Sequence, residues 1–260
     1  MSRVPSVVIV GGGTAGVHAC RILRGLDELA EVTLIEPTGQ HQFLTRLAAV
    51  AGGVSDESSA SMPLSELVDA YVIHERAFCI EENAVTLHSG EVVEADRILL
   101  TAGAEPSEPS IPGIGNALTL RSASDALAIR RAARATSSVV IIGGGPTGCQ
   151  LAGALAAGPF DVFVTLIEAS GRLLNGFNPV LGQRALEILT SRGVSVWTGR
   201  SVQRIERDAV VTLNGTASGT PVWTGGFRAN ADRFVDAPTI EGRVCVDRFG
   251  QVAGSETIFA

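Results

Sequence analysis

The sequence predicts an α/β protein that contains the same β-α-β unit twice. An apolar run leads into a glycine-rich turn at residues 7–20, VVIVGGGTAGVHAC, and the pattern recurs 132 positions later at residues 139–152, VVIIGGGPTGCQLA. An acid follows each turn at the end of another apolar run, as Glu36 in VTLIEP and Glu168 in VTLIEA. A glycine-rich turn between a strand and a helix, with an acid about 20 residues further on, is typical of a unit that binds a dinucleotide.

The residue types in each turn fit that function. Gly11 allows a tight turn, Gly13 lets the backbone approach a pyrophosphate, and Gly16 lets the helix pack close to the strand. The N-terminus of the helix favours phosphates, and Glu36 can accept hydrogen bonds from ribose hydroxyls. The other predicted cofactor-binding residues are Thr14 and Ala15 in the first turn, and Gly143, Gly145, Pro146, Thr147, Gly148 and Glu168 in the second.

One such motif is a weak signal, because other α/β proteins also contain glycine-rich turns. Two matched copies are a strong signal, and they predict two Rossmann-like domains that hold two dinucleotides for hydride or electron transfer. In the second copy, Glu168 would repel a 2′-phosphate, although Arg172 could fold back toward it. We therefore expect NADH rather than NADPH at the second turn.

Composition excludes several other classes of protein. The 20 basic residues, all arginine, and the 27 acidic residues give a net charge of −7, which disfavours a nucleic-acid partner. The cysteines lack the spacing of a redox dithiol or a zinc knuckle, and the histidines lack metal-ligand spacing, so we expect no metal. No signal peptide and no stretch of membrane-spanning length is visible, so we expect a cytoplasmic protein. Packing roles are expected for Cys20, Cys149 and the histidines.

The segments between the two units predict further elements. Residues 37–66 are expected to be a loop-rich insertion with a short helix near Ser65. The other expected elements are a strand meander at 76–100, a linker at 104–116, an arginine-rich helix at 121–135, a helix at 180–192 capped by Gly193, strands at 194–213 and 220–224, and strands and turns at 243–260. Arg130, Arg131 and Arg134 are interpreted as a solvated face of their helix.

Together these motifs resemble the flavoprotein reductases with two dinucleotide folds (the disulfide-reductase-like FAD/NAD(P)-binding fold), and most closely the type II NADH:quinone oxidoreductases. The segment HQFLTRLAAVAGGVS (41–55), which contains Arg46, is similar to the loop that approaches the flavin in that family. ADRILLTAGAEP (95–106) resembles the crossover along the FAD, with Thr101, Ala102 and Gly103 where A-T-G is usual. VWTGGFRAN (222–230) resembles W-T-A-G, whose glycine near the nicotinamide corresponds to Gly225.

The resemblance implies a fold and a reaction. The first turn would hold FAD in a discontinuous domain of residues 1–112 plus 230–260, and the second would hold NADH in a domain of residues 113–229. Hydride would pass from NADH to FAD, and electrons would continue to a small-molecule acceptor such as a quinone. Gln150 stands where the family usually has a glutamate near the nicotinamide and the flavin, so it is the one candidate catalytic residue. Local capping is the alternative role for Gln150.

The resemblance also implies that the FAD domain is cut short. The sequence stops at SETIFA, where the family continues with A-G-D and a C-terminal domain that carries the quinone site and the membrane-binding helices. Membrane contact is therefore expected only through that further part, and a homodimer is compatible with the sequence. We expect low FAD occupancy in the 260-residue chain. The alternatives are a reductase with a different small-molecule or protein acceptor, and a nucleotide-binding remnant without turnover.

Overall fold

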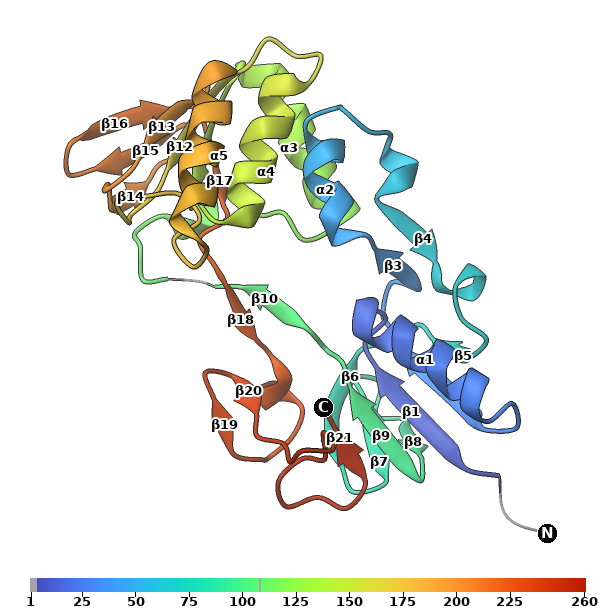
Figure 1. The fold of residues 1–260 in the computed structure, drawn as a ribbon. Helices are drawn as coiled ribbons and strands as arrows, with labels where there is room; N and C mark the ends of the chain where they lie inside the picture. Colours follow the sequence, from blue (N-terminus) through green and yellow to red (C-terminus); the bar gives the residue numbers. More distant parts are fainter. Residues whose placement is uncertain (1–3, 108) are drawn as a thin grey trace. The chain divides into compact units, whose positions relative to one another are not determined.

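The computed structural model describes residues 4–107 and 109–260 (Figure 1). It confirms the predicted α/β class with parallel sheets. The chain forms two compact units, which we call unit one and unit two. Unit one comprises Met1–Gln42, Ser61–Glu105 and Arg228–Ala260, and unit two comprises Phe43–Ala60 and Pro106–Phe227. The expected domain boundaries differ mainly at residues 43–60, which belong to unit two.

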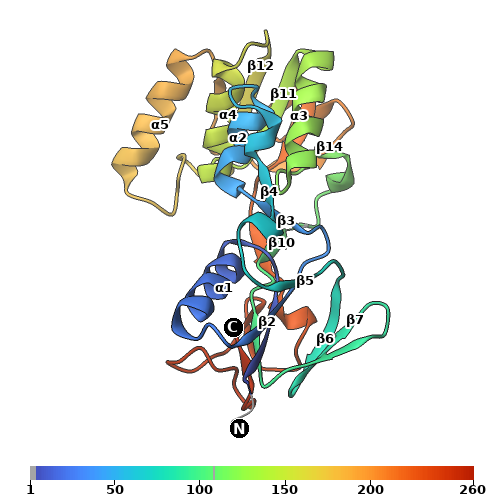
Figure 2. The ribbon, with the colours of Figure 1, turned by 90° about the vertical axis from the view of Figure 1, so that its right-hand side faces the viewer.

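The main sheet of unit one has five parallel strands in the order β21-β9-β1-β2-β5 (Figure 1), and Figure 2 shows β2 and β5 of this sheet together with α1. These strands are β1 (Ser6–Val10), β2 (Glu31–Ile35), β5 (Tyr71–Ile73), β9 (Arg97–Leu100) and β21 (Ile258–Phe259). Helix α1 (Thr14–Leu26) joins β1 to β2. A second, antiparallel sheet contains β6 (Ala77–Glu81), β7 (Ala84–Leu87) and β8 (Val92–Glu94), as the predicted meander requires.

Residues 7–10 of β1 form a continuous apolar run, and both faces of this run are covered. Ile9 packs with residues of α1 such as Val17 and Cys20, whereas Val8 and Val10 belong to a cluster with residues of β6 and β7. A parallel strand between two layers is typically such a continuous apolar run. The sequence pattern thus places β1 in the centre of the sheet, and it leaves the turn after β1 at the carboxyl edge.

Unit two repeats this arrangement. Its parallel sheet has the order β13-β12-β11-β17, and an antiparallel sheet of order β14-β15-β16 packs beside it. The strands are β11 (Ser138–Ile142), β12 (Phe163–Ile167), β13 (Ser195–Trp197), β14 (Val202–Ile205), β15 (Ala209–Thr212), β16 (Gly215–Ser218) and β17 (Thr220–Trp223). Val139 and Ile141 belong to the cluster with the helices, whereas Val140 and Ile142 belong to the cluster with β14–β16. Both faces of β11 are therefore buried.

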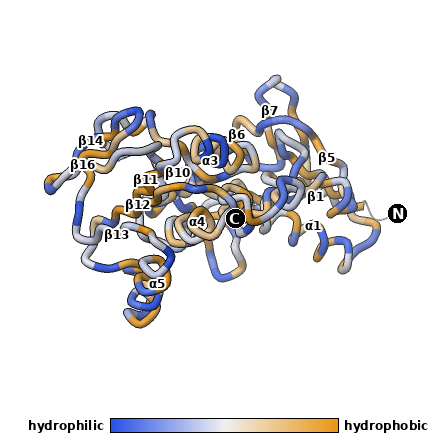
Figure 3. The backbone as a smooth tube through the Cα atoms, turned by 90° about the horizontal axis from the view of Figure 1, so that it is seen from above, coloured by the Kyte–Doolittle hydropathy of each residue, from blue (hydrophilic) through white to orange (hydrophobic). Residues whose placement is uncertain are grey.

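Three helices of unit two start at recognisable signals. They are α3 (Ala123–Thr136), α4 (Pro146–Ala157) and α5 (Pro179–Ser191). The Ser122 hydroxyl and the Asp125 carboxylate form a capping box on α3, and proline is the first residue of α4 and α5. Gly193 follows α5 with a φ of +83°, as the sequence predicted. Figure 3 shows hydrophilic and hydrophobic segments alternating along α5, which is amphipathic.

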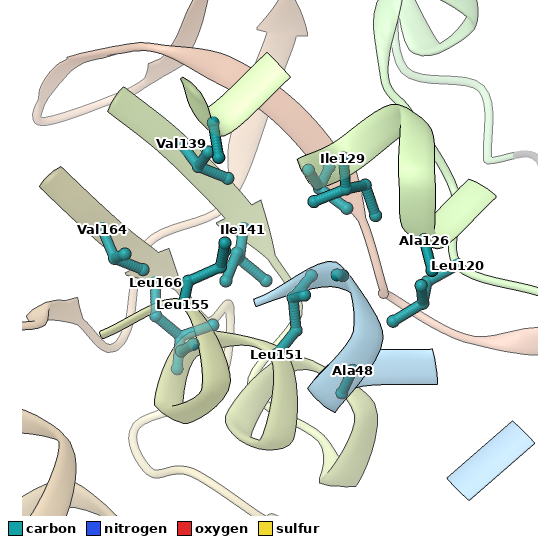
Figure 4. Close-up of a cluster of buried hydrophobic side chains, with 14 of the residues drawn as sticks. Ala48, Leu120, Ala126, Ile129, Val139, Ile141, Leu151, Leu155, Val164 and Leu166 are labelled. Carbon is teal, nitrogen blue, oxygen red and sulfur yellow. The ribbon is translucent and has the colours of Figure 1, made fainter. Parts of the chain in front are cut away.

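The segment expected to be loop-rich contains a buried helix, so that prediction was wrong in part. Helix α2 (Leu44–Ala51) buries Leu47, Ala48, Val50 and Ala51. Its apolar face joins the core between α3, α4 and the sheet of unit two, as Figure 4 shows for Ala48 beside Leu151. The long spacing after Glu36 suggested a loop, but the apolar periodicity of these eight residues is that of a helix.

The end of α2 is held at very short range. A Cβ built on Gly158 would lie 1.9 Å from the carbonyl oxygen of Gly52, so the backbones after α2 and α4 touch. The guanidinium of Arg130 on α3 donates hydrogen bonds to the carbonyl oxygens of Val50 and Ser55, the latter at 2.8 Å. Arg130 was interpreted as part of a solvated face, which is wrong, because it satisfies carbonyl groups at the end of α2.

The remaining elements are short. Two-stranded pairs are formed by β3 (Gln40–Gln42) with β4 (Ser61–Pro63), β10 (Ala104–Pro106) with β18 (Phe227–Ala229), and β19 (Thr239–Ile240) with β20 (Arg243–Val244). Single 3-10 turns lie at Glu57–Ser59, Leu64–Glu66, Ile114–Asn116 and Ala231–Arg233. Within the described ranges, no helix is both long enough and apolar enough to cross a membrane.

The segment just before the last strand of unit one is hydrogen-bonded to a carboxylate. Glu82, between β6 and β7, accepts hydrogen bonds from the Thr257 hydroxyl and from the Glu256 backbone N–H at 3.2 Å, just before β21. Hydrogen bonds from Ser255 and Thr257 hold the pKa of Glu82 below its ordinary value of 4.5. A carboxyl group whose pKa is lowered by folding stabilises the fold when the pH is above its ordinary, unfolded-state pKa. This stabilisation is lost as the pH falls through the lowered pKa.

We therefore expect acid to loosen the β21 edge in a way that depends on Glu82. The Glu82→Gln variant should lose about 1 kcal/mol or less at neutral pH, because the carboxylate is exposed. Its unfolding free energy should then fall less steeply than that of the wild type below about pH 4.5, the usual carboxyl range. Denaturant unfolding at a series of pH values measures this. Equal slopes for the two proteins would show that Glu82 does not contribute.

Candidate functional site

The first glycine-rich turn combines two crowded positions with one open position. Gly11, directly after β1, has a φ of +113°, which strongly favours glycine. A Cβ on Gly16 would lie 1.9 Å from the Gly11 carbonyl oxygen, whereas a Cβ on Gly13 would have nothing within 4 Å. The first and third glycines of the motif therefore pack the helix against the strand. Gly13, at the N-cap of α1, leaves room for a ligand to approach the backbone.

The second turn has the same geometry. Gly143 follows β11 with a φ of +112°, and a Cβ on Gly148 would lie 1.9 Å from the Gly143 carbonyl oxygen. Gly145, the N-cap of α4, again has nothing within 4 Å of its built Cβ. The first N–H groups of each helix have no acceptor within the helix, so each turn offers donors beside an open space.

The first turns of both helices carry the other predicted cofactor-binding residues. Thr14 and Ala15 are exposed at the start of α1. At the start of α4, Pro146 is exposed and Thr147 is half-buried. Pro146 has no N–H to donate, so in the second turn donors near the N-cap come from its neighbours. The structure therefore brings each group of predicted turn residues together around one helix N-terminus.

Each acid lies beside its turn and holds it. Glu36 accepts a hydrogen bond from the Gly12 N–H at 3.1 Å and one from the Thr38 hydroxyl at 2.9 Å. In the second copy, Glu168 accepts from the Gly144 N–H at 2.6 Å and from the Ser170 hydroxyl at 2.6 Å. The carboxylates therefore orient the middle glycine of the turn, in addition to the predicted role toward ribose hydroxyls.

In each sheet, the strand that pairs with the other edge of β1 or β11 is followed by a threonine that contacts the turn. The Thr101 hydroxyl, after β9, lies 3.0 Å from the Val10 carbonyl oxygen and 2.9 Å from that of Gly11. The Thr224 hydroxyl, after β17, lies 2.9 Å from the Ile142 carbonyl oxygen and 3.0 Å from that of Gly143. Thr101 was predicted, but Thr224 was missed. The repeated pattern of T-A-G at 101–103 and T-G-G at 224–226 was the signal for it.

The crossover after Thr101 is also fixed by side-chain hydrogen bonds. With its amide oriented to satisfy both atoms, Asn230 donates to the carbonyl oxygens of Gly103 at 2.7 Å and of Ala102 at 3.1 Å. Gly103 has a φ of +70° and open space around its built Cβ. In unit two, a Cβ on Gly225 would lie 2.4 Å from the Trp223 ring, so Gly225 is required for packing. No role had been predicted for Asn230 itself.

A buried histidine contacts the backbone of the first turn, a role that was not predicted from the sequence. His41 on β3 is buried, with 6% of its surface exposed, and its Nδ1 lies 2.9 Å from the Gly12 carbonyl oxygen. The sequence suggested only a packing role, because no metal-ligand spacing was present. The equivalent carbonyl in the second copy, that of Gly144, is contacted by the Cys149 thiol at 3.4 Å. Both turns therefore have a side chain on the middle carbonyl.

Three candidate residues lie apart from these contacts. Arg46 is exposed in the first turn of α2, in unit two, with its guanidinium 5.7 Å from the Phe43 ring centroid. Gln150 is exposed on α4 and has no side-chain hydrogen bond within the described ranges. Arg172 does not fold back toward Glu168. Its guanidinium donates to the carbonyl oxygens of Asn175 at 2.6 Å and Phe177 at 3.1 Å. The roles predicted for Arg46 and Gln150 stay predictions.

A cavity lies between the loop after β12 and helix α5 of unit two. It has a volume of about 430 Å³ and is lined by residues of the loop after β12, of α5 and of the end of β13, namely Gly171, Arg172, Leu173, Pro179, Val180, Gly182, Gln183, Leu186 and Thr198. The carboxyl ends of parallel strands are the usual position of ligand sites in such sheets. The lining is largely apolar, with few polar side chains.

Cys20 is buried and Cys149 is half-buried, and the pKa of each thiol is raised. Burial raises the pKa of Cys20 to about 11 and, with the nearby Glu168 carboxylate as a smaller cause, that of Cys149 to about 11. A protonated thiol is a poor nucleophile. Cys20 packs in the core of unit one, as predicted. No group of side chains that could hold a metal ion occurs among the described residues.

The two turns define a class of protein that binds two dinucleotides on two similar α/β units. The residues fit such ligands. The space beside Gly13 and Gly145 is open, and the carboxylates of Glu36 and Glu168 lie at the end of the neighbouring strand, where they contact the turn. Comparison with known proteins identifies the family. Residues 5–260 match the pyridine nucleotide-disulphide oxidoreductases, and the chain belongs to this family.

Curated relatives agree with the resemblance that the sequence indicated. The chain is 26% identical to an internal alternative NAD(P)H-ubiquinone oxidoreductase of Arabidopsis thaliana, over 98% of this chain and 60% of the relative. It is 26% identical to the type II NADH:quinone oxidoreductase Ndh of Mycobacterium tuberculosis, over 95% of this chain and 62% of the relative. A biphenyl dioxygenase ferredoxin–NAD(+) reductase component of Paraburkholderia xenovorans is 29% identical over 66% of this chain and 44% of the relative.

Solved structures confirm the fold. The NDH2 structure from Plasmodium falciparum in complex with NADH has a TM-score of 0.84 and 17% identity, and the match covers 99% of this chain and 63% of that one. The prediction of an oxidoreductase with two dinucleotide-binding folds is therefore confirmed at the level of the family. The chain spans about 60% of the length of the NAD(P)H-quinone oxidoreductases that it matches.

Proposed function

We propose that unit one binds FAD at the turn after β1 and that unit two binds NADH at the turn after β11. The repeated geometry supports this proposal most strongly. Each turn has an open glycine at a helix N-cap, a crowded third glycine and a carboxylate on the middle N–H. Relatives named as NAD(P)H or NADH oxidoreductases support the nicotinamide nucleotide.

The proposed reaction is hydride transfer from NADH to FAD and electron transfer from the flavin to an acceptor. When bound, FAD supplies the chemistry of hydride acceptance, and the protein supplies binding, position and electrostatics. Glu36 and Glu168 accept hydrogen bonds from ribose hydroxyls and from the N–H groups of the turns. The N-termini of α1 and α4 bind the pyrophosphates. Gln150 is proposed to lie near the nicotinamide. Its amide can hydrogen-bond but cannot titrate.

A quinone is the proposed acceptor. Two relatives matched over most of the chain are named quinone reductases, whereas the ferredoxin reductase component is matched over two thirds of it. A peripheral position at a membrane and a homodimer are proposed only for a protein that contains the further segments of those relatives. Turnover with ubiquinone and menaquinone analogues, measured beside turnover with a ferredoxin, distinguishes the two classes of acceptor.

A visible absorption spectrum, taken before and after anaerobic addition of NADH, tests the central proposal. Flavin bands near about 370 and 450 nm that bleach with NADH would support both cofactors and hydride transfer between them. A protein that retains FAD but does not bleach would instead be a nucleotide-binding remnant. A protein that stays colourless after incubation with FAD and desalting would contradict the proposed FAD site in this chain.

A further inference from the structure

Thr101 and Thr224 contact the first peptide group of the glycine-rich turn in their respective units. We call the threonine and the glutamate that contact this peptide group a clamp. In unit two, the carbonyl oxygen of Gly143 faces the Thr224 hydroxyl at 3.0 Å, and the N–H of Gly144 donates to Glu168 at 2.6 Å. Gly143 O and Gly144 N belong to one peptide group. The hydroxyl that follows β17 and the carboxylate that follows β12 therefore contact this peptide group at its two ends.

Unit one contains the same arrangement, built from the same residue types at the corresponding positions. The Gly11 carbonyl oxygen faces the Thr101 hydroxyl at 2.9 Å, and the Gly12 N–H donates to Glu36 at 3.1 Å. Two independently folded turns thus place the same three groups at the same positions. A side chain that only filled space would not need to present a hydroxyl to both carbonyl oxygens in both copies.

The threonine also meets the third glycine of the motif. A Cβ on Gly16 would lie 2.9 Å from the Thr101 hydroxyl oxygen, and one on Gly148 would lie 2.8 Å from that of Thr224. The hydroxyl therefore sits where strand, turn and helix come closest. Its two carbonyl acceptors lie at the end of the strand and the start of the turn, so the hydroxyl links the strand to the turn next to the helix.

We infer that Thr101 and Thr224 are positioning residues for cofactor binding. Each hydroxyl prevents the first peptide group of its turn from rotating, and thereby keeps the following N–H groups aimed at the open space beside Gly13 or Gly145. Glycine has the widest conformational freedom of any residue, so a turn of three consecutive glycines needs such external fixation. This inference rests on the proposed function, in that the ligands of the turns are FAD and NADH.

Valine and serine variants of each threonine test the inference. Val keeps the volume and removes the hydroxyl, whereas Ser keeps the hydroxyl. We expect Thr224→Val to weaken NADH binding about tenfold with FAD retention unchanged, and Thr224→Ser to restore most of the affinity, because a buried carbonyl left without its donor is unfavourable. Thr101→Val should weaken FAD binding about tenfold and leave NADH binding unchanged. Fluorescence titration with NADH and with FAD gives both dissociation constants.

Thr212→Val is the matched control. The Thr212 hydroxyl is buried in the same unit and donates to the Gly215 carbonyl oxygen at 2.8 Å, far along the chain from the glycine-rich turn. This variant should lose stability without losing NADH affinity. Wild-type affinity in Thr224→Val, or equal weakening in Thr224→Ser and Thr224→Val, would overturn the inference. A wild-type chain that binds neither cofactor would instead contradict the proposed function.

Discussion

Replacing Gly148 by alanine is expected to weaken NADH binding about 100-fold. The added Cβ would lie 1.9 Å from the Gly143 carbonyl oxygen and 2.8 Å from the Thr224 hydroxyl oxygen, and the backbone oxygen can give way only by moving the turn. Overpacking of this kind costs about 1–3 kcal/mol, and each 1.4 kcal/mol changes affinity about tenfold. Isothermal titration with NADH measures the effect.

The same helix provides a control for this prediction. Gly153 also lies in α4, but a Cβ there would meet only the Leu189 side chain at 3.7 Å, an ordinary contact. Gly153→Ala should therefore leave NADH binding unchanged and stabilise the helix by about 0.5–1 kcal/mol. Unit one offers the corresponding pair on α1, where Gly16→Ala should release FAD and Gly25→Ala should not.

The pattern across the four variants is the decisive result. Gly148→Ala should affect NADH alone, and Gly16→Ala should affect FAD alone. Loss of both cofactors in either variant, with circular dichroism showing unfolding, would mean that the turn contributes mainly to the fold. Wild-type NADH affinity in Gly148→Ala would contradict the assignment of the second turn as the nucleotide site.

Replacing Glu168 by glutamine is expected to weaken NADH binding about tenfold. It should also reduce the binding preference for NADH over NADPH about 100-fold. Its carboxylate accepts hydrogen bonds from the Gly144 N–H at 2.6 Å and from the Ser170 N–H at 2.7 Å. Charge-assisted bonds of this type contribute about 1.5–3 kcal/mol each, and Gln retains only the weaker neutral acceptor. The same change removes the repulsion between the carboxylate and a 2′-phosphate, which amounts to several kcal/mol at short range.

The measurement is a pair of titrations, with NADH and with NADPH, on Glu168→Gln and the wild type. Glu187→Gln is the control, because Glu187 is an exposed acid on α5 of the same unit that pairs with Arg184 at 3.2 Å. It changes the net charge equally and should leave both affinities unchanged. The role of Glu168 would be disproved by an unchanged ratio of the two dissociation constants. An equal shift in Glu187→Gln would show that net charge alone is responsible.

The sequence by itself determined the parts of the protein that depend on local chemistry. The glycine-rich turns were predictable because a positive φ at Gly11 and Gly143 and a missing Cβ at Gly16 and Gly148 are requirements of single positions. The strands before them were predictable because burial on both faces needs a continuous apolar run. The spacing of the acids placed them at the ends of the next strands, where the structure has them.

Only the tertiary structure decided which distant residues complete each turn. Thr224 reaches the Gly143 carbonyl because the parallel strands β11 and β17 bring their carboxyl ends together. Asn230 reaches the crossover at Ala102 because β18, which precedes it, pairs with β10. No short-range pattern states which strands become neighbours. The structure also assigned α2 to unit two, through contacts with α3 and α4 that join positions about 80 or more residues apart, as in the bond from Arg130 to Val50. Long-range pairing of this kind depends on the whole chain, so the sequence near each residue could not reveal it.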